Sequence, residues 1–186
     1  MSDTRLSPGA NDDASGVAVL LALAEHLANQ PAVGIEVWFL STGSEEGLLG
    51  GMSAFIERHG SEFEGRRPFV LNLEMLGSGR PVYIESEGFL RRYSYQAEAV
   101  DLARDVAADE EFAGIGSLAA SPFVSDALIA TRNGIPAITI ASLNDAGYVP
   151  NYHWSSDTPE NVDLTSVEDA YAFSRRLVER LGELNR

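Results

Sequence analysis

The chain has 186 residues, of which 45% are hydrophobic, so it is long enough to bury the core of one domain covering residues 1–186. Its formal net charge of −15 argues against nucleic acid as a partner, because a phosphate backbone needs a basic surface. The lack of cysteine excludes disulfides and thiolate metal sites, and no apolar run approaches the roughly 20 residues of a membrane span. These properties do not decide the cellular compartment.

Runs with helical spacing of apolar residues alternate along the chain with short apolar runs typical of buried strands. In chain order, the pattern predicts a helix over residues 17–28, a strand over 35–41, a helix over 48–58, strands over 69–75 and 81–85, a helix over 89–108, a loop over 114–122, a helix over 123–132, a strand over 135–141, an irregular segment over 142–162 and a helix over 166–184. Such alternation predicts an α/β fold, a three-layer α/β/α sandwich around a mostly parallel mixed sheet.

Two adjacent carboxylates, Glu45 and Glu46, stand between a predicted strand and a predicted helix. Neighbouring carboxylates repel each other and lose hydration at a strand end, so a fold keeps them mainly where a cation or a reacting proton compensates. The alternative is that Ser44 caps the following helix and both acids favour its positive end. This stretch alone leaves both interpretations open.

Further metal-competent side chains fall at or just beyond the ends of predicted strands, or before the first helix. In mostly parallel sheets the carboxyl ends of the strands share one edge, and ligands bind there. So many such groups at one edge are hard to explain as helix caps, and a metal site is favoured. The set comprises Asp12, Asp13, Glu45, Glu46, Glu74 and His153.

Several segments, taken in order, resemble the M28 family of zinc exopeptidases, which includes bacterial aminopeptidases. The resemblance covers essentially the whole chain and implies a single M28-like peptidase catalytic domain. It rests on Pro8-Gly9-Ala10-Asn11-Asp12-Asp13-Ala14-Ser15-Gly16, Gly43-Ser44-Glu45-Glu46-Gly47-Leu48-Leu49-Gly50, Asn72-Leu73-Glu74-Met75, Ser125-Asp126 with Gly134-Ile135-Pro136-Ala137, and Tyr152-His153 with Asp157-Thr158.

The resemblance implies a set of metal ligands, with two zinc ions per chain in the intact family. Asp12 would bridge the two ions. Glu46 and His153 would share one of them with Asp12, and Glu74 would hold the other, at a position where many relatives have Asp. Asp13 falls where the family often has Asn or Asp.

The resemblance also implies the groups that act on the substrate. Glu45 would be the general base that takes a proton from a metal-activated water and hands it to the leaving amine. Tyr152 occupies a position that can hydrogen-bond the developing oxyanion in some relatives. Ser125, Asp126 and Asp157 are expected to support the site without ligating metal.

The departure from the family pattern lies at the amino terminus. Relatives carry a His-x-Asp motif in which the His ligates zinc and the Asp supports it; here Asp3 matches the Asp, and the His position is Met1. Relatives also have a segment before this motif that supplies the first strands of the sheet. We therefore expect a fold lacking those strands and one impaired zinc site, because His26 and His59 lie in predicted helices and offer no obvious replacement. The sequence either begins late or is a natural remnant.

The function implied is that of a zinc-dependent exopeptidase of aminopeptidase type, acting on peptides with a free amino terminus, with low or no activity in this form. One alternative is a single-zinc enzyme resembling glutaminyl cyclases. Another is a non-catalytic fragment or binding domain of the same fold. Carboxypeptidase-type specificity and the preferred side chain stay open, and self-association is expected as one way to cover an open sheet edge.

Overall fold

The computed structural model describes residues 6–185 and contains a four-stranded sheet in the order β1-β6-β2-β5. The strands are β1 (Val70–Glu74), β2 (Arg80–Ile84), β5 (Gly116–Leu118) and β6 (Ala137–Leu143). β1 runs parallel to β6 and β2 runs parallel to β5, while β2 and β6 are antiparallel. The predicted mixed, mostly parallel sheet is therefore confirmed.

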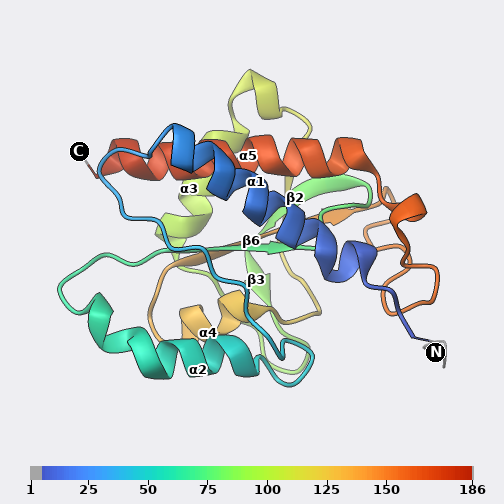
Figure 1. Ribbon diagram of the computed structural model, residues 1–186, viewed down its shortest axis with the longest axis horizontal. Coiled ribbons are helices and arrows are strands. Elements are labelled where there is room, and N and C mark those ends of the chain that lie inside the picture. Colours follow the sequence, from blue (N-terminus) through green and yellow to red (C-terminus); the bar gives the residue numbers. More distant parts are fainter. Residues whose placement is uncertain (1–5, 186) are drawn as a thin grey trace.

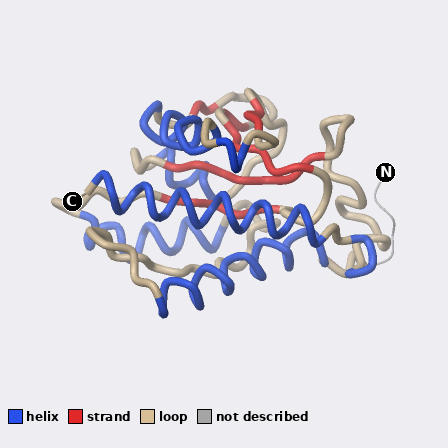
Figure 2. Tube along the Cα trace, turned by 90° about the horizontal axis from the view of Figure 1, so that it is seen from above, coloured by secondary structure: helices blue, strands red, loops and turns tan. Residues whose placement is uncertain are grey.

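Helices cover both faces of this sheet (Figure 1). On one face lie α1 (Ser15–Asn29), α3 (Ala97–Ala107) and α5 (Leu164–Leu184), and on the other lie α2 (Gly50–His59) and α4 (Asp126–Arg132). The view from above shows the two longest helices, α1 and α5, crossing the molecule in front of the strands (Figure 2). The smaller elements are η1 (Ala10–Ala14), η2 (Gly60–Phe63), β3 (Ser86–Glu87), β4 (Tyr93–Ser94), η3 (Glu110–Phe112) and η4 (Pro159–Asn161).

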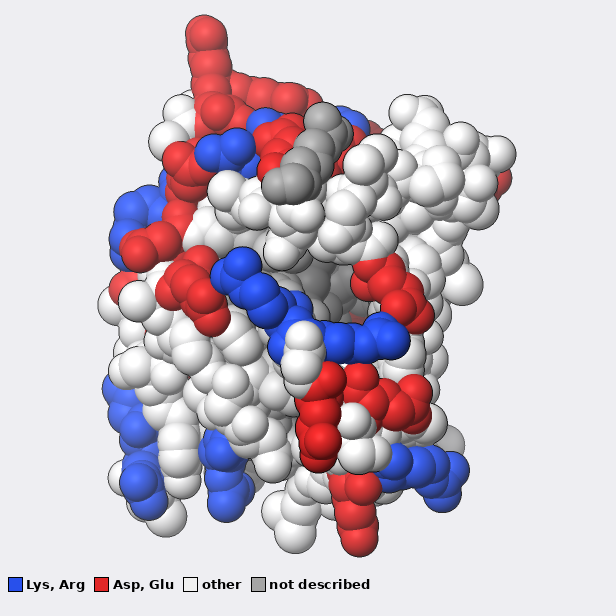
Figure 3. Space-filling view, turned by 90° about the vertical axis from the view of Figure 1, so that its left-hand side faces the viewer, with Lys and Arg blue, Asp and Glu red and all other residues white. Residues whose placement is uncertain are grey.

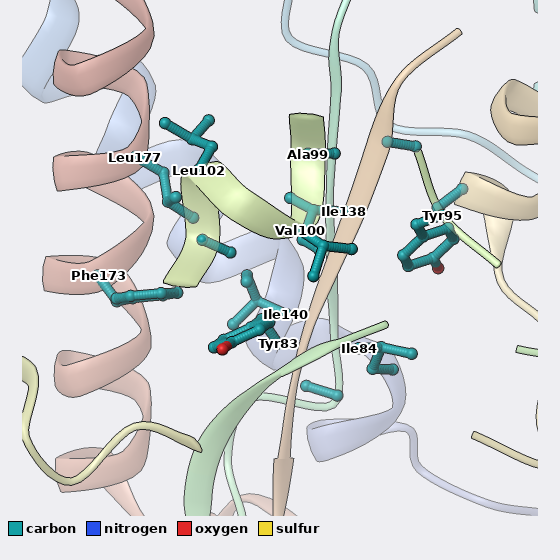
Figure 4. Packing of buried hydrophobic residues seen from close by; sticks show 14 of the residues in the cluster. Tyr83, Ile84, Tyr95, Ala99, Val100, Leu102, Ile138, Ile140, Phe173 and Leu177 are labelled. Carbon is teal, nitrogen blue, oxygen red and sulfur yellow. The ribbon is translucent and has the colours of Figure 1, made fainter. Parts of the chain in front are cut away.

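The main core lies between the sheet and the helices α3 and α5, which cover one of its faces (Figure 4). Phe173 and Leu177 of α5 and Ile138 and Ile140 of β6 are all 0% exposed. Fully burying each of these side chains contributes roughly 1.5–3 kcal/mol, so this layer fixes the sheet on which the carboxyl-edge loops are mounted.

Most predicted elements are confirmed with ends shifted by a few residues, but the predicted strand over residues 35–41 is wrong. These residues join no sheet, and Trp38, Phe39 and Leu40 are 41%, 39% and 36% exposed. A strand is defined by its hydrogen-bonded neighbour, and no described strand lies next to this segment. The apolar pattern identified an extended run and could not supply the missing partner.

Three further predictions differ from the structure around the small elements. The helix predicted over residues 89–108 begins only at Ala97, because residues 86–94 instead form the β3–β4 pair. Gly88, at φ 120°, turns the chain there and donates its N–H to the carbonyl oxygens of Ser121 and Phe123. The predicted loop over residues 114–122 contains β5, which pairs with β2 beyond the reach of any local pattern. The helix predicted from residue 123 begins at Asp126.

No helix within residues 6–185 combines the length and apolar character needed to cross a membrane.

Candidate active site

Asp12, Glu46 and His153 come together at the carboxyl edge of the sheet from η1, the loop before α2 and the loop before η4. One ligand atom from each of the three lies within 4.8 Å of the others. The Nε2 atom of His153 is 2.6 Å from Oε1 of Glu46 and 3.4 Å from Oδ2 of Asp12. The side chains of Asp12, His153 and Glu46 are 20%, 39% and 65% exposed, so the group opens to solvent on its Glu46 side.

The segments around this group contain non-glycine residues in the left-handed backbone conformation, which residues with a side chain rarely adopt. Among the described residues, every non-glycine with positive φ lies in the loop before α2, directly after β1, or in the loop holding His153. Each such residue costs on the order of 1 kcal/mol or more, and strain of this kind is typical of functional sites. The residues are Ser44, Leu48, Leu49, Met75, Asn151 and His153, with φ of 59°, 67°, 57°, 51°, 61° and 59°.

Asp157 positions the backbone that carries Asp12. Its carboxylate accepts hydrogen bonds from the backbone N–H of Asn11 at 2.7 Å and of Asp12 at 3.1 Å, and the residue is only 1% exposed. Two donors from adjacent residues fix the direction of the chain at this point. The predicted supporting position of Asp157 therefore corresponds to direct contacts with the backbone of a candidate ligand.

Asp13 is not part of the three-residue group, and it connects its own segment to the end of β1. Its Oδ1 accepts hydrogen bonds from the backbone N–H of Met75 at 2.8 Å and of Gly16 at 3.3 Å. Burial raises the pKa of Asp13 to about 7, against the lowering effect of these two bonds. The carboxylate thus connects the start of α1 to the strand end that carries Glu74.

Glu45 lies beside the group and has a pKa raised to about 7. Burial is the largest cause, followed by repulsion from Glu46, Asp126 and Asp12, while His153 acts in the opposite direction. A carboxyl group poised near neutrality can exchange a proton under ordinary conditions, which is what a general base requires.

Glu74 ends β1 as predicted but does not join Asp12, Glu46 and His153 within the 4.8 Å group. Its pKa is raised well above the ordinary value, first by burial and then by repulsion from Asp13 and Glu45, and Asn72 donates a hydrogen bond that opposes this. The structure therefore places Glu74 next to the site and leaves it outside the group of three.

Tyr152 stacks on His153, with ring centroids 3.9 Å apart, and packs against Phe123 at 5.1 Å. Burial and the nearby carboxylates of Glu46 and Asp12 raise the pKa of its phenol above the ordinary value. The phenol therefore keeps its proton at neutral pH and can serve as a hydrogen-bond donor.

Ser125 and Asp126 lie at the start of α4, behind the site. Thr42 donates a hydrogen bond to Oδ2 of Asp126, and burial raises the pKa of that carboxyl group. Ser125 donates to Oε2 of Glu87 at 2.9 Å.

Glu87 is 1% exposed, and the sequence analysis missed it. Its pKa is raised to about 7, chiefly by burial. Hydrogen bonds connect Glu87 through Ser125 and Thr139 to Asn72, and Asn72 donates to Glu74. A local sequence pattern cannot predict this connection, because the contacts join distant segments.

Four further residues that the sequence analysis names are not among the described groups around this site. Asp3 and Met1 lie outside the described residues. His26 is 4.0 Å from Glu179, in the interface of α1 with α5, and His59 lies 2.6 Å from Glu62 at the end of α2. Both histidines therefore pair with carboxylates of their own surroundings.

Comparison with known proteins identifies the family. The family model described as Peptidase family M28 matches residues 2–178. The chain belongs to peptidase family M28. Its relatives include the probable lipoprotein aminopeptidase LpqL of Mycobacterium tuberculosis, which is 26% identical over 86% of this chain and 37% of LpqL.

Solved structures with a similar fold include BSAP, a zinc aminopeptidase from Bacillus subtilis. Its TM-score is 0.76 at 24% sequence identity, and the match covers 92% of this chain and 42% of BSAP. A glutaminyl cyclase from Porphyromonas gingivalis has a TM-score of 0.66 at 20% identity, over 94% and 64%. At these identities the structures show the fold. The chain spans about two fifths of the length of LpqL and of BSAP.

Proposed function

We propose that this M28 chain carries a zinc-dependent hydrolytic site of aminopeptidase type, acting on peptide bonds next to a free amino terminus. The observation that carries the proposal is the convergence of Asp12, Glu46 and His153 within 4.8 Å, with Glu45 beside them. Membership of the peptidase family and the zinc aminopeptidase with the same fold support it.

The three side chains suit zinc. Zinc in proteins takes imidazole nitrogen and carboxylate oxygen, and a catalytic site has three protein ligands with one open position. Asp12, Glu46 and His153 offer two carboxylates and one imidazole, and the group is open to solvent on one side. Bound there, zinc would lower the pKa of a water molecule and polarise a carbonyl group. Glu74 would contribute to a second, impaired site.

Residues of the chain supply the proton transfers. Glu45, which lies beside the proposed ligands and is not one of them, takes a proton from the attacking water and delivers it to the leaving amine. The phenol of Tyr152 donates a hydrogen bond to the developing oxyanion. The relatives described as aminopeptidases support aminopeptidase over carboxypeptidase specificity.

The test is hydrolysis of leucine 4-nitroanilide by the zinc-loaded protein, with N-acetyl-leucine 4-nitroanilide as the matched substrate. We expect slow, zinc-dependent release of nitroaniline from the free amine, none from the acetylated compound, and none from the Glu45→Gln variant. A protein that binds zinc at this site and hydrolyses neither substrate would instead be a binding domain of the peptidase fold.

A second candidate is a single-zinc glutaminyl cyclase, which the position of Glu74 outside the group of three favours. In such an enzyme the α-amino nitrogen of an amino-terminal glutamine attacks the carbon of its own side-chain amide, and the bond from that carbon to the amide nitrogen breaks to release ammonia. Pyroglutamate formed from a glutamine-initiated peptide, without hydrolysis of leucine 4-nitroanilide, would replace the aminopeptidase assignment with this one.

A further inference from the structure

The β3–β4 pair ends in an exposed loop of residues 88–92, which we call the hairpin tip. Gly88 opens this loop with φ 120° and donates its N–H to the carbonyl oxygens of Ser121 and Phe123, both at 3.2 Å. Phe89 and Leu90 follow, and they are 83% and 95% exposed. The fold thus holds two adjacent large apolar side chains in solvent on an anchored loop, where another molecule can cover them.

The hairpin tip is continuous with the candidate active site. The carbonyl oxygen of Phe123 accepts the hydrogen bond from Gly88, and the ring of Phe123 lies 5.1 Å from that of Tyr152, which stacks on His153 at 3.9 Å. Phe123 is itself 44% exposed. An extended peptide covers roughly 3.3–3.6 Å per residue, so a peptide whose amino terminus lies at the proposed zinc site reaches the tip within a few residues.

Arginines gather around Tyr93, at the base of the hairpin tip. The guanidinium carbons of Arg91 and Arg132 lie 5.1 and 5.9 Å from the centroid of the Tyr93 ring. Arg92 precedes Tyr93 in the chain, and all three arginines are exposed. The cation–π contacts therefore hold positive charge at the tip, beside its apolar residues.

These three arginines form no ion pair with any residue between 6 and 185. By contrast, the basic side chains around the hollow at the carboxyl-terminal end lie directly beside acidic ones (Figure 3). In a chain with a net charge of −15, a basic cluster without acidic partners is complementary to an acidic ligand. The arginines that do pair with carboxylates are Arg66, Arg80, Arg104, Arg175, Arg176 and Arg180.

We propose that the hairpin tip binds the part of a peptide substrate that follows the cleaved bond. Apolar residues of the peptide pack on Phe89 and Leu90, and an acidic residue after them meets the three arginines. The inference rests on the proposed function, because it places the amino terminus of the peptide at the zinc site. A peptide fits better than an anionic lipid surface, since the tip adjoins the site and the net charge of the chain repels such a surface.

The probe is the peptide Leu-Ala-Val-Phe-Glu-Glu-amide, titrated by calorimetry into the zinc-loaded Glu45→Gln chain, which does not hydrolyse it. Its counterpart is Leu-Ala-Val-Phe-Lys-Lys-amide. The net charge of the chain favours the Lys peptide and the three arginines favour the Glu peptide, so the two effects predict opposite preferences. We expect the Glu peptide to bind at least tenfold more tightly. Equal binding, or tighter binding of the Lys peptide, would overturn the proposal.

Charge exchange locates the contact. Arg92→Glu should weaken binding of the Glu peptide at least tenfold and strengthen binding of the Lys peptide. Arg132→Glu tests the same cluster from α4 without altering the hairpin, and it should act in the same direction. Arg67→Glu is the matched control, because Arg67 is also exposed and forms no ion pair with a described residue. An affinity ratio that changes as much in the control would contradict the proposal, because the position of the charge would then not matter.

The apolar contact is tested by replacing Phe89 and Leu90 together by Ser, with Leu164→Ser, at a side chain that is 70% exposed, as the control. We expect about tenfold weaker binding of the Glu peptide in the double variant alone. No preference between the peptides, with binding to phosphatidylglycerol vesicles that the double variant loses, would overturn the proposal in favour of a lipid surface.

Hydrolysis of leucine 4-nitroanilide, which has no amino acid after the cleaved bond, reports on the proposed function separately. A chain without turnover that keeps the preference for the Glu peptide would contradict the peptidase chemistry and support peptide binding at the tip.

Discussion

The buried carboxylate of Asp157 accepts a hydrogen bond at 3.1 Å from the backbone N–H of Asp12, 145 residues away in the chain. Asp157 follows His153 in the same loop, so a single segment supplies one candidate ligand and aligns the backbone of another. The carboxyl-terminal loop thereby sets the relative placement of two of the three groups proposed to hold zinc.

We predict that Asp157→Asn weakens zinc binding by 10–100-fold and lowers the free energy of unfolding by about 1–3 kcal/mol. An amide offers one acceptor oxygen and turns an NH2 group toward a backbone N–H, so one of the two bonds is lost. Zinc titration and urea unfolding measure the two effects. Asp145→Asn, at a side chain that is 94% exposed, is the matched control and should change neither. Normal zinc affinity in the Asp157 variant would show that the loop is aligned by other contacts.

The adjacent glutamates are predicted to separate binding from chemistry. Glu45→Gln should keep zinc and lose at least about 100-fold in hydrolysis of leucine 4-nitroanilide, because an amide cannot accept the proton. Glu46→Gln should instead weaken zinc binding, since Glu46 lies 2.6 Å from His153 within the ligand group. Zinc content and turnover are measured on the same samples. If the two variants behave alike, the division of roles between them is wrong.

Stability is predicted to depend on pH through Glu87. Burial raises its pKa from 4.5 to about 7, so between these pH values the folded state holds a proton that the unfolded state has released. The free energy of unfolding therefore falls by roughly 3 kcal/mol for this one group as the pH rises through this window. Above the window this group causes no further change. Glu87→Gln should remove that part of the slope in urea unfolding at pH 5 and pH 8. The exposed Glu168→Gln is the control, and a slope unchanged in Glu87→Gln would refute this origin.

The sequence could predict the sheet edge on which the site lies, because that prediction depends on local signals. Glu46 and Glu74 follow recognisable apolar runs, and the alternation of elements places their ends on one edge. His153 falls at the same edge because it lies beyond the end of the predicted strand over residues 135–141, and the family resemblance adds only its role as a ligand. What local patterns could not predict is which of these carboxylates meet: Glu74 stands outside the group that Asp12 and Glu46 form with His153.

The errors share a physical cause. Residues 35–41 have the composition of a strand, but pairing depends on a neighbour that the described chain does not place there. The amphipathic pattern of α3 predicts a helix that begins at residue 89, but the helix begins at Ala97. The bonds of Gly88 to Ser121 and Phe123 turn the chain before it, and Tyr93 and Ser94 form β4. Glu87 was missed for the same reason, because its burial is created by Ser125 and Tyr95 from distant segments.

The most direct test of the proposed site is zinc stoichiometry, measured by titration after exhaustive dialysis, for the parent chain, His153→Ala and His59→Ala. Both histidines place a ring nitrogen 2.6 Å from a glutamate oxygen, so the second variant controls for the loss of any such pair. We predict one zinc per chain in the parent and in His59→Ala, and at least a hundredfold weaker binding in His153→Ala. A parent chain that binds no zinc, or a His153→Ala variant that binds it as tightly, would contradict the assignment of Asp12, Glu46 and His153 as the metal site.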